Sequence, residues 1–158
     1  MADVIINCTT GGVPKHAVPE AVLTMTGLAG DYHAKTEIHG GPERALCLYA
    51  LELIHRLQDE GHPIFPGSIG ENVTLAGLDW AALQPGTRLA LGETVIEISS
   101  YTSPCKTIAA SFTDGAFSRI AQKLHPGWSR LYARVLKAGR LATGETARVL
   151  NGSDDSTD

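Results

Sequence analysis

The sequence has little cysteine, few aromatic residues and no long apolar run, and these shortages exclude several classes of protein. Its three cysteines, at positions 8, 47 and 105, form no CxxC pair, so neither a disulfide scaffold nor a structural zinc site is expected. No apolar stretch approaches the roughly 20 residues that a membrane-spanning helix needs, and the first residues lack the basic start and apolar centre of a signal peptide. We therefore expect a cytoplasmic protein with reduced thiols and no membrane partner.

An excess of positive charge is also missing. The chain has 13 lysine and arginine residues against 17 acidic ones, for a net charge of -4. Such a charge gives no general attraction to a phosphate backbone, so nucleic acid is not an expected partner. The 158 residues, 43% hydrophobic and 19% charged, are typical of one globular domain. We predict a single domain over residues 1–150 and a disordered acidic tail over residues 151–158.

Short apolar segments separated by glycine and proline predict a mainly β fold. We expect strands at residues 4–7, 21–26, 45–49, 71–75, 88–91, 94–99, 130–137 and 144–150. Residues 130–137 also fit a helix, although strand is preferred. Helical spacing of apolar residues predicts a helix that ends at Gly61, a helical turn at 78–83, and a helix over 115–124 capped by Asp114. The pattern favours an antiparallel β-barrel with two or three short helices, a mainly β (α+β) fold.

Cys105 is the most informative cysteine, because it lies between Pro104 and Lys106 in a polar segment. Proline donates no backbone hydrogen bond and disfavours a regular strand, which predicts that the thiol lies where a strand ends. Lys106, together with arginines that the fold brings close, would lower the pKa of the thiol and favour a reactive thiolate. The alternative is a loop cysteine without a role. Cys47, within an apolar run, is expected to be an inert core residue.

Two other polar patterns are candidates for ligand binding. Glu71 and Asn72 follow a glycine loop and pair a carboxylate with an amide, which could bind the edge of a heterocycle; a turn cap is the alternative. A basic stretch could bind an anion such as phosphate, or form a solvated helix face. Its members are Arg119, Lys123, Arg130 and Arg134.

The glycine-rich segment 27–41 raises the question of a metal site. It contains His33 and His39 together with Asp31 and Glu37. However, the HxxxxxH spacing in a loop is not a recognised zinc pattern, so an autonomous zinc site is not expected.

Five segments that span most of the chain resemble the MOSC domain, named for the C-terminal part of molybdenum cofactor sulfurase. They are GLAGDYH at 27–33, HGGPERALCLYALELI at 39–54, GSIGENVTLAGLDW at 67–80, PGTRLALGETVIEISSYTSPCKTI at 85–108 and HPGWSRLYARVL at 125–136. The order Gly-Asp, His-Gly-Gly, Gly-Glu-Asn and Pro-Cys carries the resemblance. With no further domain in view, the chain is most similar to the small standalone bacterial members of the YiiM type.

The resemblance implies a β-rich, barrel-like fold that binds the molybdenum cofactor, molybdopterin. Cys105 matches the family cysteine that is thought to bind sulfur or to ligate molybdenum. Motif matching further implies a set of cofactor-binding residues. These are Asp31, His39, Gly41, Glu71 and Asn72 around the pocket, with Arg134 on the phosphate of the cofactor. We further expect Lys106 to hold an anionic group of the cofactor.

The implied activity is reduction of N-hydroxylated bases or related small molecules. The chain has no cysteine set for an iron–sulfur cluster, so electrons are expected from a flavin or iron–sulfur partner protein. A sulfur-carrier or cofactor-carrier module that acts through a persulfide on Cys105 is the alternative. A protein-interaction module without chemistry is a third reading, and the chain is expected to be either a monomer or a homodimer.

Overall fold

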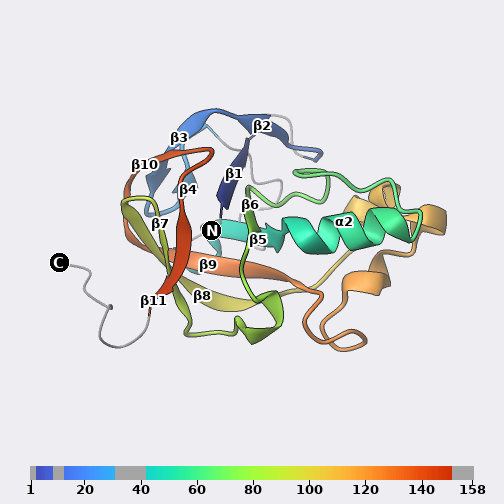
Figure 1. Cartoon of the computed structure of the whole chain (residues 1–158). Helices are drawn as coiled ribbons and strands as arrows, with labels where there is room; N and C mark the ends of the chain where they lie inside the picture. Colours follow the sequence, from blue (N-terminus) through green and yellow to red (C-terminus); the bar gives the residue numbers. More distant parts are fainter. Residues whose placement is uncertain (1–2, 9–12, 31–41, 151–158) are drawn as a thin grey trace.

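Two β-sheets account for most of the regular structure in the computed structural model, which describes residues 3–8, 13–30 and 42–150 (Figure 1). The strands are β1 (Asp3–Cys8), β2 (His16–Val18), β3 (Glu20–Thr24), β4 (Gly27–Leu28), β5 (Leu46–Ala50), β6 (Val73–Ala76), β7 (Arg88–Leu91), β8 (Thr94–Thr102), β9 (Arg130–Lys137), β10 (Gly139–Ala142) and β11 (Ala147–Leu150). One α-helix, α2 (Leu51–Asp59), is described, with the 3₁₀ helices η1 (Pro42–Arg44), η2 (Trp80–Ala82), η3 (Lys106–Ser111), η4 (Thr113–Gly115) and η5 (Phe117–Ile120).

The larger sheet is mixed rather than purely antiparallel. Its order is β11-β7-β8-β9-β5-β6-β1-β2, and the smaller sheet has the order β10-β3-β4. β5 and β6 pair in parallel, because α2 supplies the crossover connection that parallel neighbours need. The larger sheet ends at β11 and β2, and within the described part of the chain no pairing joins these edges. The mainly β prediction is confirmed, but the expected closed barrel is not.

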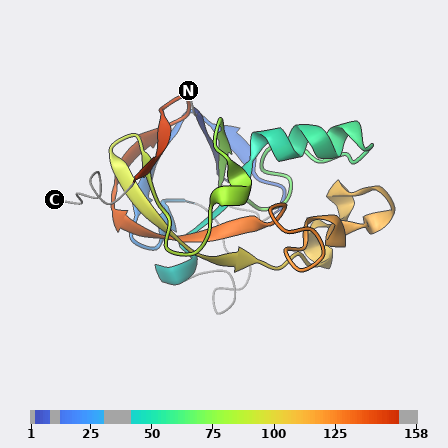
Figure 2. The ribbon, with the colours of Figure 1, turned by 60° about the horizontal axis from the view of Figure 1, so that its bottom comes forward.

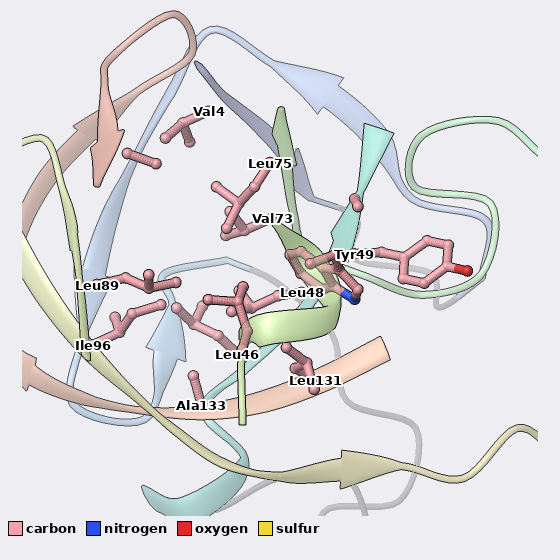
Figure 3. Close-up of a cluster of buried hydrophobic side chains, with 14 of the residues drawn as sticks. Val4, Leu46, Leu48, Tyr49, Val73, Leu75, Leu89, Ile96, Leu131 and Ala133 are labelled. Carbon is pink, nitrogen blue, oxygen red and sulfur yellow. The ribbon is translucent and has the colours of Figure 1, made fainter. Parts of the chain in front are cut away.

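Both sheets contribute to one apolar core. Leu46 and Leu48 of β5 meet Leu131 and Ala133 of β9 there, and all four are 2% exposed or less. Figure 3 shows these side chains gathered with apolar groups of β1, β6, β7 and β8. Because successive side chains of a strand point to opposite faces, the intervening residues of β5 and β9 lie on the other face of the sheet.

The helix expected at 51–61 is confirmed, and the one expected at 115–124 is wrong. α2 buries Leu53, Ile54 and Leu57 and is followed by Gly61 in the left-handed region, at φ 98°. In place of this second helix, the chain forms two separate 3₁₀ turns, η4 and η5. Asp114 does not act as an N-cap, because it lies at φ 58°, a left-handed conformation that cannot continue a right-handed helix.

The described helices are short. Among them, none has the length and apolar character required to cross a membrane.

Candidate functional site

Polar side chains gather on the face of β5, β9 and β8 that lies away from the core. Cys47 is the cross-strand neighbour of Tyr132, and on the other side Tyr132 pairs with Ser100 and Arg130 with Thr102. η1 lies against this face (Figure 2). Its Arg44 places the guanidinium carbon 5.2 Å from the centroid of the Tyr132 ring, within cation–π range.

We call this group the outer-face cluster. It consists of Lys15, Cys47, Glu71, Thr102, Cys105, Arg130 and Tyr132. Cys47 is influenced electrostatically by Arg130, Glu71 and Lys15. Both thiols influence Tyr132 electrostatically. The members of the cluster come from five separate segments of the chain.

Two aromatic side chains fix the backbone that leads into Arg130. The Tyr49 hydroxyl donates a hydrogen bond to the carbonyl of Trp128 over 2.7 Å, and the Trp80 indole N–H donates to the carbonyl of Ser129 over 2.9 Å. The two rings meet edge to face with centroids 6.1 Å apart. Figure 3 shows Tyr49 reaching away from the labelled core side chains. β9 is thereby anchored at the residue before Arg130.

Arg130 is the buried cation of the cluster, with 6% of its surface exposed. Its terminal nitrogens donate to the carbonyls of Ile69, over 2.9 Å, and Ser103, over 3.3 Å. Its buried Nε has no hydrogen-bond partner. Since both hydrogen bonds go to neutral carbonyl groups, much of the positive charge is available to a ligand.

Glu71 is fully buried beside this cation. Burial raises the pKa of its carboxyl to about 7, against the opposing effects of the Gly67 and Glu71 backbone N–H groups and of Arg130. The Thr74 hydroxyl donates to Oε2 over 3.3 Å. Although these N–H groups favour the charged form, no donor meets hydrogen-bond geometry at Oε1. The carboxyl therefore has a hydrogen-bond donor at Oε2 and none at Oε1, and it changes its charge near neutral pH.

Asn72 holds the backbone of Cys47 in place. The Cys47 N–H donates to Asn72 Oδ1 over 2.9 Å, and the Asn72 N–H donates to the Cys47 carbonyl over the same distance. The side-chain oxygen of Asn72 thus accepts from a backbone N–H. This role is similar to the turn cap considered as the alternative for this residue. Asn72 is 1% exposed and positions Cys47 next to Glu71.

Cys47 lies outside the core in which its apolar neighbours place it. The thiol is half-buried and lies outside the apolar core, because the alternation that sends Leu46 and Leu48 inward sends Cys47 outward. Burial raises the pKa of the thiol, while Arg130 lowers it and Glu71 raises it further. Cys47 is therefore held mainly as a neutral thiol.

Lys15 is a member of the cluster that the sequence did not indicate. It is 5% exposed, and its N–H donates to the Gly67 carbonyl over 2.8 Å. Its charge lowers the pKa of Cys47. The neighbouring residues Pro14 and His16 give no local pattern that distinguishes this lysine from a surface one.

Cys105 lies just beyond β8, as Pro104 predicts, at the N-cap position of η3. Its thiol is half-buried and donates to Thr107 Oγ1 over 3.3 Å. Burial raises the pKa of Tyr132 to about 12, with a larger contribution from Cys47 than from Cys105 in the same direction. The candidate thiol therefore lies within electrostatic range of the same tyrosine as Cys47.

The two expected anion ligands lie differently from Arg130. Lys106 is exposed on η3. Arg134 is on the same face of β9, but its Nε lies 3.1 Å from a carboxylate oxygen of Glu43 and 3.3 Å from one of Glu97. These carboxylates neutralise Arg134, so Arg130 is the better candidate for an anion ligand.

Three of the expected site residues cannot be placed. Asp31, His39 and Gly41 lie outside the described residues, as does His33. Within the described ranges, no group of three or more histidine, cysteine or acidic side chains is arranged to hold a metal ion.

Comparison with known proteins gives a consistent family. The model of the MOSC domain matches residues 35–148. YflK of Bacillus subtilis is 29% identical over 143 residues, which cover 90% of this chain and 64% of YflK. YiiM of Escherichia coli is 29% identical over 143 residues, which cover 87% of this chain and 62% of YiiM. The chain thus spans a little under two thirds of the length of these curated relatives.

Solved structures agree on the fold. The crystal structure of YiiM from Escherichia coli superimposes with a TM-score of 0.67 at 26% identity, covering 96% of this chain and 70% of that one. YiiM from Geobacillus stearothermophilus gives a TM-score of 0.70 at 21% identity, covering 94% and 73%. On the match of the family model and these relatives, the chain belongs to the MOSC domain family.

Proposed function

We propose that the outer-face cluster binds the molybdenum cofactor and that the protein is a cytoplasmic reductase of N-hydroxylated bases or related compounds. One observation carries the proposal: Glu71 Oε1 and Arg130 Nε are buried and have no hydrogen-bond partner. These side chains are 0% and 6% exposed. Buried polar atoms are nearly always paired, so two unpaired polar atoms in one cluster favour a polar ligand.

The donor set fits such a cofactor. A soft thiolate is a suitable ligand for molybdenum, and Cys105 supplies a partly accessible thiol. Arg130 and Lys15 supply buried positive charge for an anionic group, a role first expected of Arg134 and Lys106. Glu71 offers an acceptor for a heterocycle N–H through Oε1. The same cluster thus provides a metal ligand, cations and a polar edge.

The bound cofactor would supply the two-electron chemistry. The overall change is N–OH plus two electrons and two protons to N–H plus water. The chain's residues would hold the cofactor, with the metal at Cys105, and orient the substrate. The electrons would come from a separate flavin or iron–sulfur protein.

The test is the metal content of protein purified from a molybdenum-replete host. We expect the wild type to retain molybdenum, and Cys105→Ser to lose about tenfold or more of it. Cys47→Ser is the matched control, because it removes the other thiol that influences Tyr132 and should keep the metal. A wild type without molybdenum, or a Cys105→Ser variant with unchanged activity on N-hydroxylated purines, contradicts the proposal.

A sulfur carrier is the second candidate, favoured by the partial exposure of Cys105. Here the persulfide of a cysteine desulfurase would pass its outer sulfur to the Cys105 thiolate and leave the desulfurase as a thiol. Mass spectrometry of the intact protein after incubation with a desulfurase and cysteine distinguishes the two. A gain of one sulfur atom that is lost in Cys105→Ser supports the carrier, and an unchanged mass excludes it.

A further inference from the structure

Glu71 combines three properties that a structural carboxylate rarely has together. It is 0% exposed, Oε2 accepts a 3.3 Å hydrogen bond from Thr74, and Oε1 has no hydrogen-bond partner. A buried carboxylate normally has its lone pairs filled by donors or an ion pair. This carboxyl is therefore suited to changing its protonation state rather than to holding one.

Charged and titratable groups of β5, of β9 and of the segment before β2 surround it. Arg130 of β9 favours the charged form of Glu71, and Glu71 raises the pKa of both Cys47 and Tyr49 of β5. Thr74 of β6 donates to it, and Lys15 influences the same thiol. Burial also raises the pKa of both Cys47 and Tyr49, so neither of these groups is a ready source of charge at neutral pH. Among these groups, Glu71 has the ionisation that can respond.

An anion beside Arg130 would change the balance around Glu71. Arg130 now offsets the carboxylate charge across a buried, poorly screened interior. A second negative charge on the same guanidinium competes for that compensation, and like charges in such surroundings cannot both stay ionised cheaply. The carboxyl can respond by binding a proton from solvent, after which it can also donate a hydrogen bond.

We propose that Glu71 is a proton-coupling group of this site: it binds a proton when an anion binds Arg130 and releases that proton when the anion leaves. The inference rests on the proposed function, since the anionic cofactor is the natural occupant. The inference also predicts that the affinity for an anion at Arg130 falls as pH rises across the neutral range, because the Glu71 carboxyl must be protonated in the bound state.

Calorimetry with sodium sulfate tests the coupling without the cofactor. Sulfate has no proton to exchange near pH 7, so any proton uptake comes from the protein. Titrations at pH 7 in PIPES, MOPS and Tris, which differ in ionisation enthalpy, should give heats that vary with the buffer. With the pKa of Glu71 at about 7, uptake should approach about half a proton per bound sulfate.

Three variants locate the effect. Glu71→Gln should bind sulfate with a heat that does not depend on the buffer. Glu97→Gln is the matched acidic control on the same sheet, where its carboxylate pairs with Arg88 and Arg134, and it should keep the wild-type uptake. Arg130→Met should lose most of the sulfate binding, which shows that the heat comes from this arginine.

A fourth variant guards against a Glu71→Gln protein that fails to fold. Thr74→Val removes the hydroxyl that favours the charged carboxyl, so the pH of maximal uptake should move upward. A wild-type heat that is independent of buffer, uptake that persists in Glu71→Gln, or no sulfate binding at all overturns the inference. If molybdenum is retained through Cys105 while uptake is absent, only this inference fails. If uptake is present without molybdenum, only the cofactor assignment fails.

Discussion

At the scale of single residues, Glu71 should make the stability of the fold depend on pH. Its folded pKa of about 7 lies above the ordinary value of 4.5, so the folded state holds the proton more tightly than the unfolded state. The stabilisation that Glu71 contributes should therefore be largest below about pH 4.5, fall as pH rises to about 7, and then level off. The loss attributable to Glu71 is on the order of 3 kcal/mol.

Glu71→Gln should abolish this fall. Urea unfolding from pH 5 to 8.5 should show a variant equal to the wild type at the acidic end and more stable at the basic end. Glu93→Gln, which neutralises an exposed carboxylate, should keep the wild-type slope. A parallel decline in the wild type and Glu71→Gln would contradict the raised pKa.

The sequence predicted which residue types take part in the chemistry, but it did not predict which residues lie next to each of them in the fold. Cys105 at a strand end and Glu71 near the site follow from local signals, namely Pro104 and the glycine loop. The choice between Arg130 and Arg134 does not, because both point to the same face of β9. Only the folded partners distinguish them: two carbonyls for Arg130 and two carboxylates for Arg134.

At the scale of elements, Asn72 joins β5 to the segment before β6. Asn72→Ala should destabilise the protein by about 2 kcal/mol, since it leaves the Cys47 N–H without its acceptor. Denaturant unfolding monitored by circular dichroism measures the change. Gln84→Ala, which truncates an exposed amide, is the control and should have little effect. Equal stabilities of the two variants would show that the side chain of Asn72 does not hold β5.

Elements with a repeating apolar pattern were predictable, and those set by single backbone conformations were not. In α2, the spacing of Leu53, Ile54 and Leu57 matches a buried helix face. The segment after Phe112 has similar spacing but contains Asp114 and Gly115 at positive φ. These two residues divide it into 3₁₀ turns, which periodicity alone does not reveal.

At the scale of the whole molecule, the smaller sheet and the larger sheet should unfold together because they share one core. Leu23 of β3 is 0% exposed within that core, whereas the adjacent Val22 is 53% exposed. Leu23→Ala should cost about 3 kcal/mol and shift the whole transition without changing its slope. Val22→Ala, the matched control, should stay within about 0.5 kcal/mol of the wild type.

Two probes check this cooperativity. Tryptophan fluorescence reports on Trp80 and Trp128, which pack with the larger sheet's core, and circular dichroism reports on both sheets. Coincident transitions in Leu23→Ala support a single unit. A first transition seen by circular dichroism alone would mean that the smaller sheet opens independently.

The pairing of β5 with β9 has a consequence for how the protein is made in the cell. Cys47 of β5 precedes Arg130 of β9 in the chain, and the two strands become neighbours only after β9 has left the ribosomal exit tunnel. A growing polypeptide that lacks β9 has no complete outer-face cluster. Loading of any prosthetic group must therefore await the emergence of β9, and a product terminated before β9 could not be rescued by supplying that group.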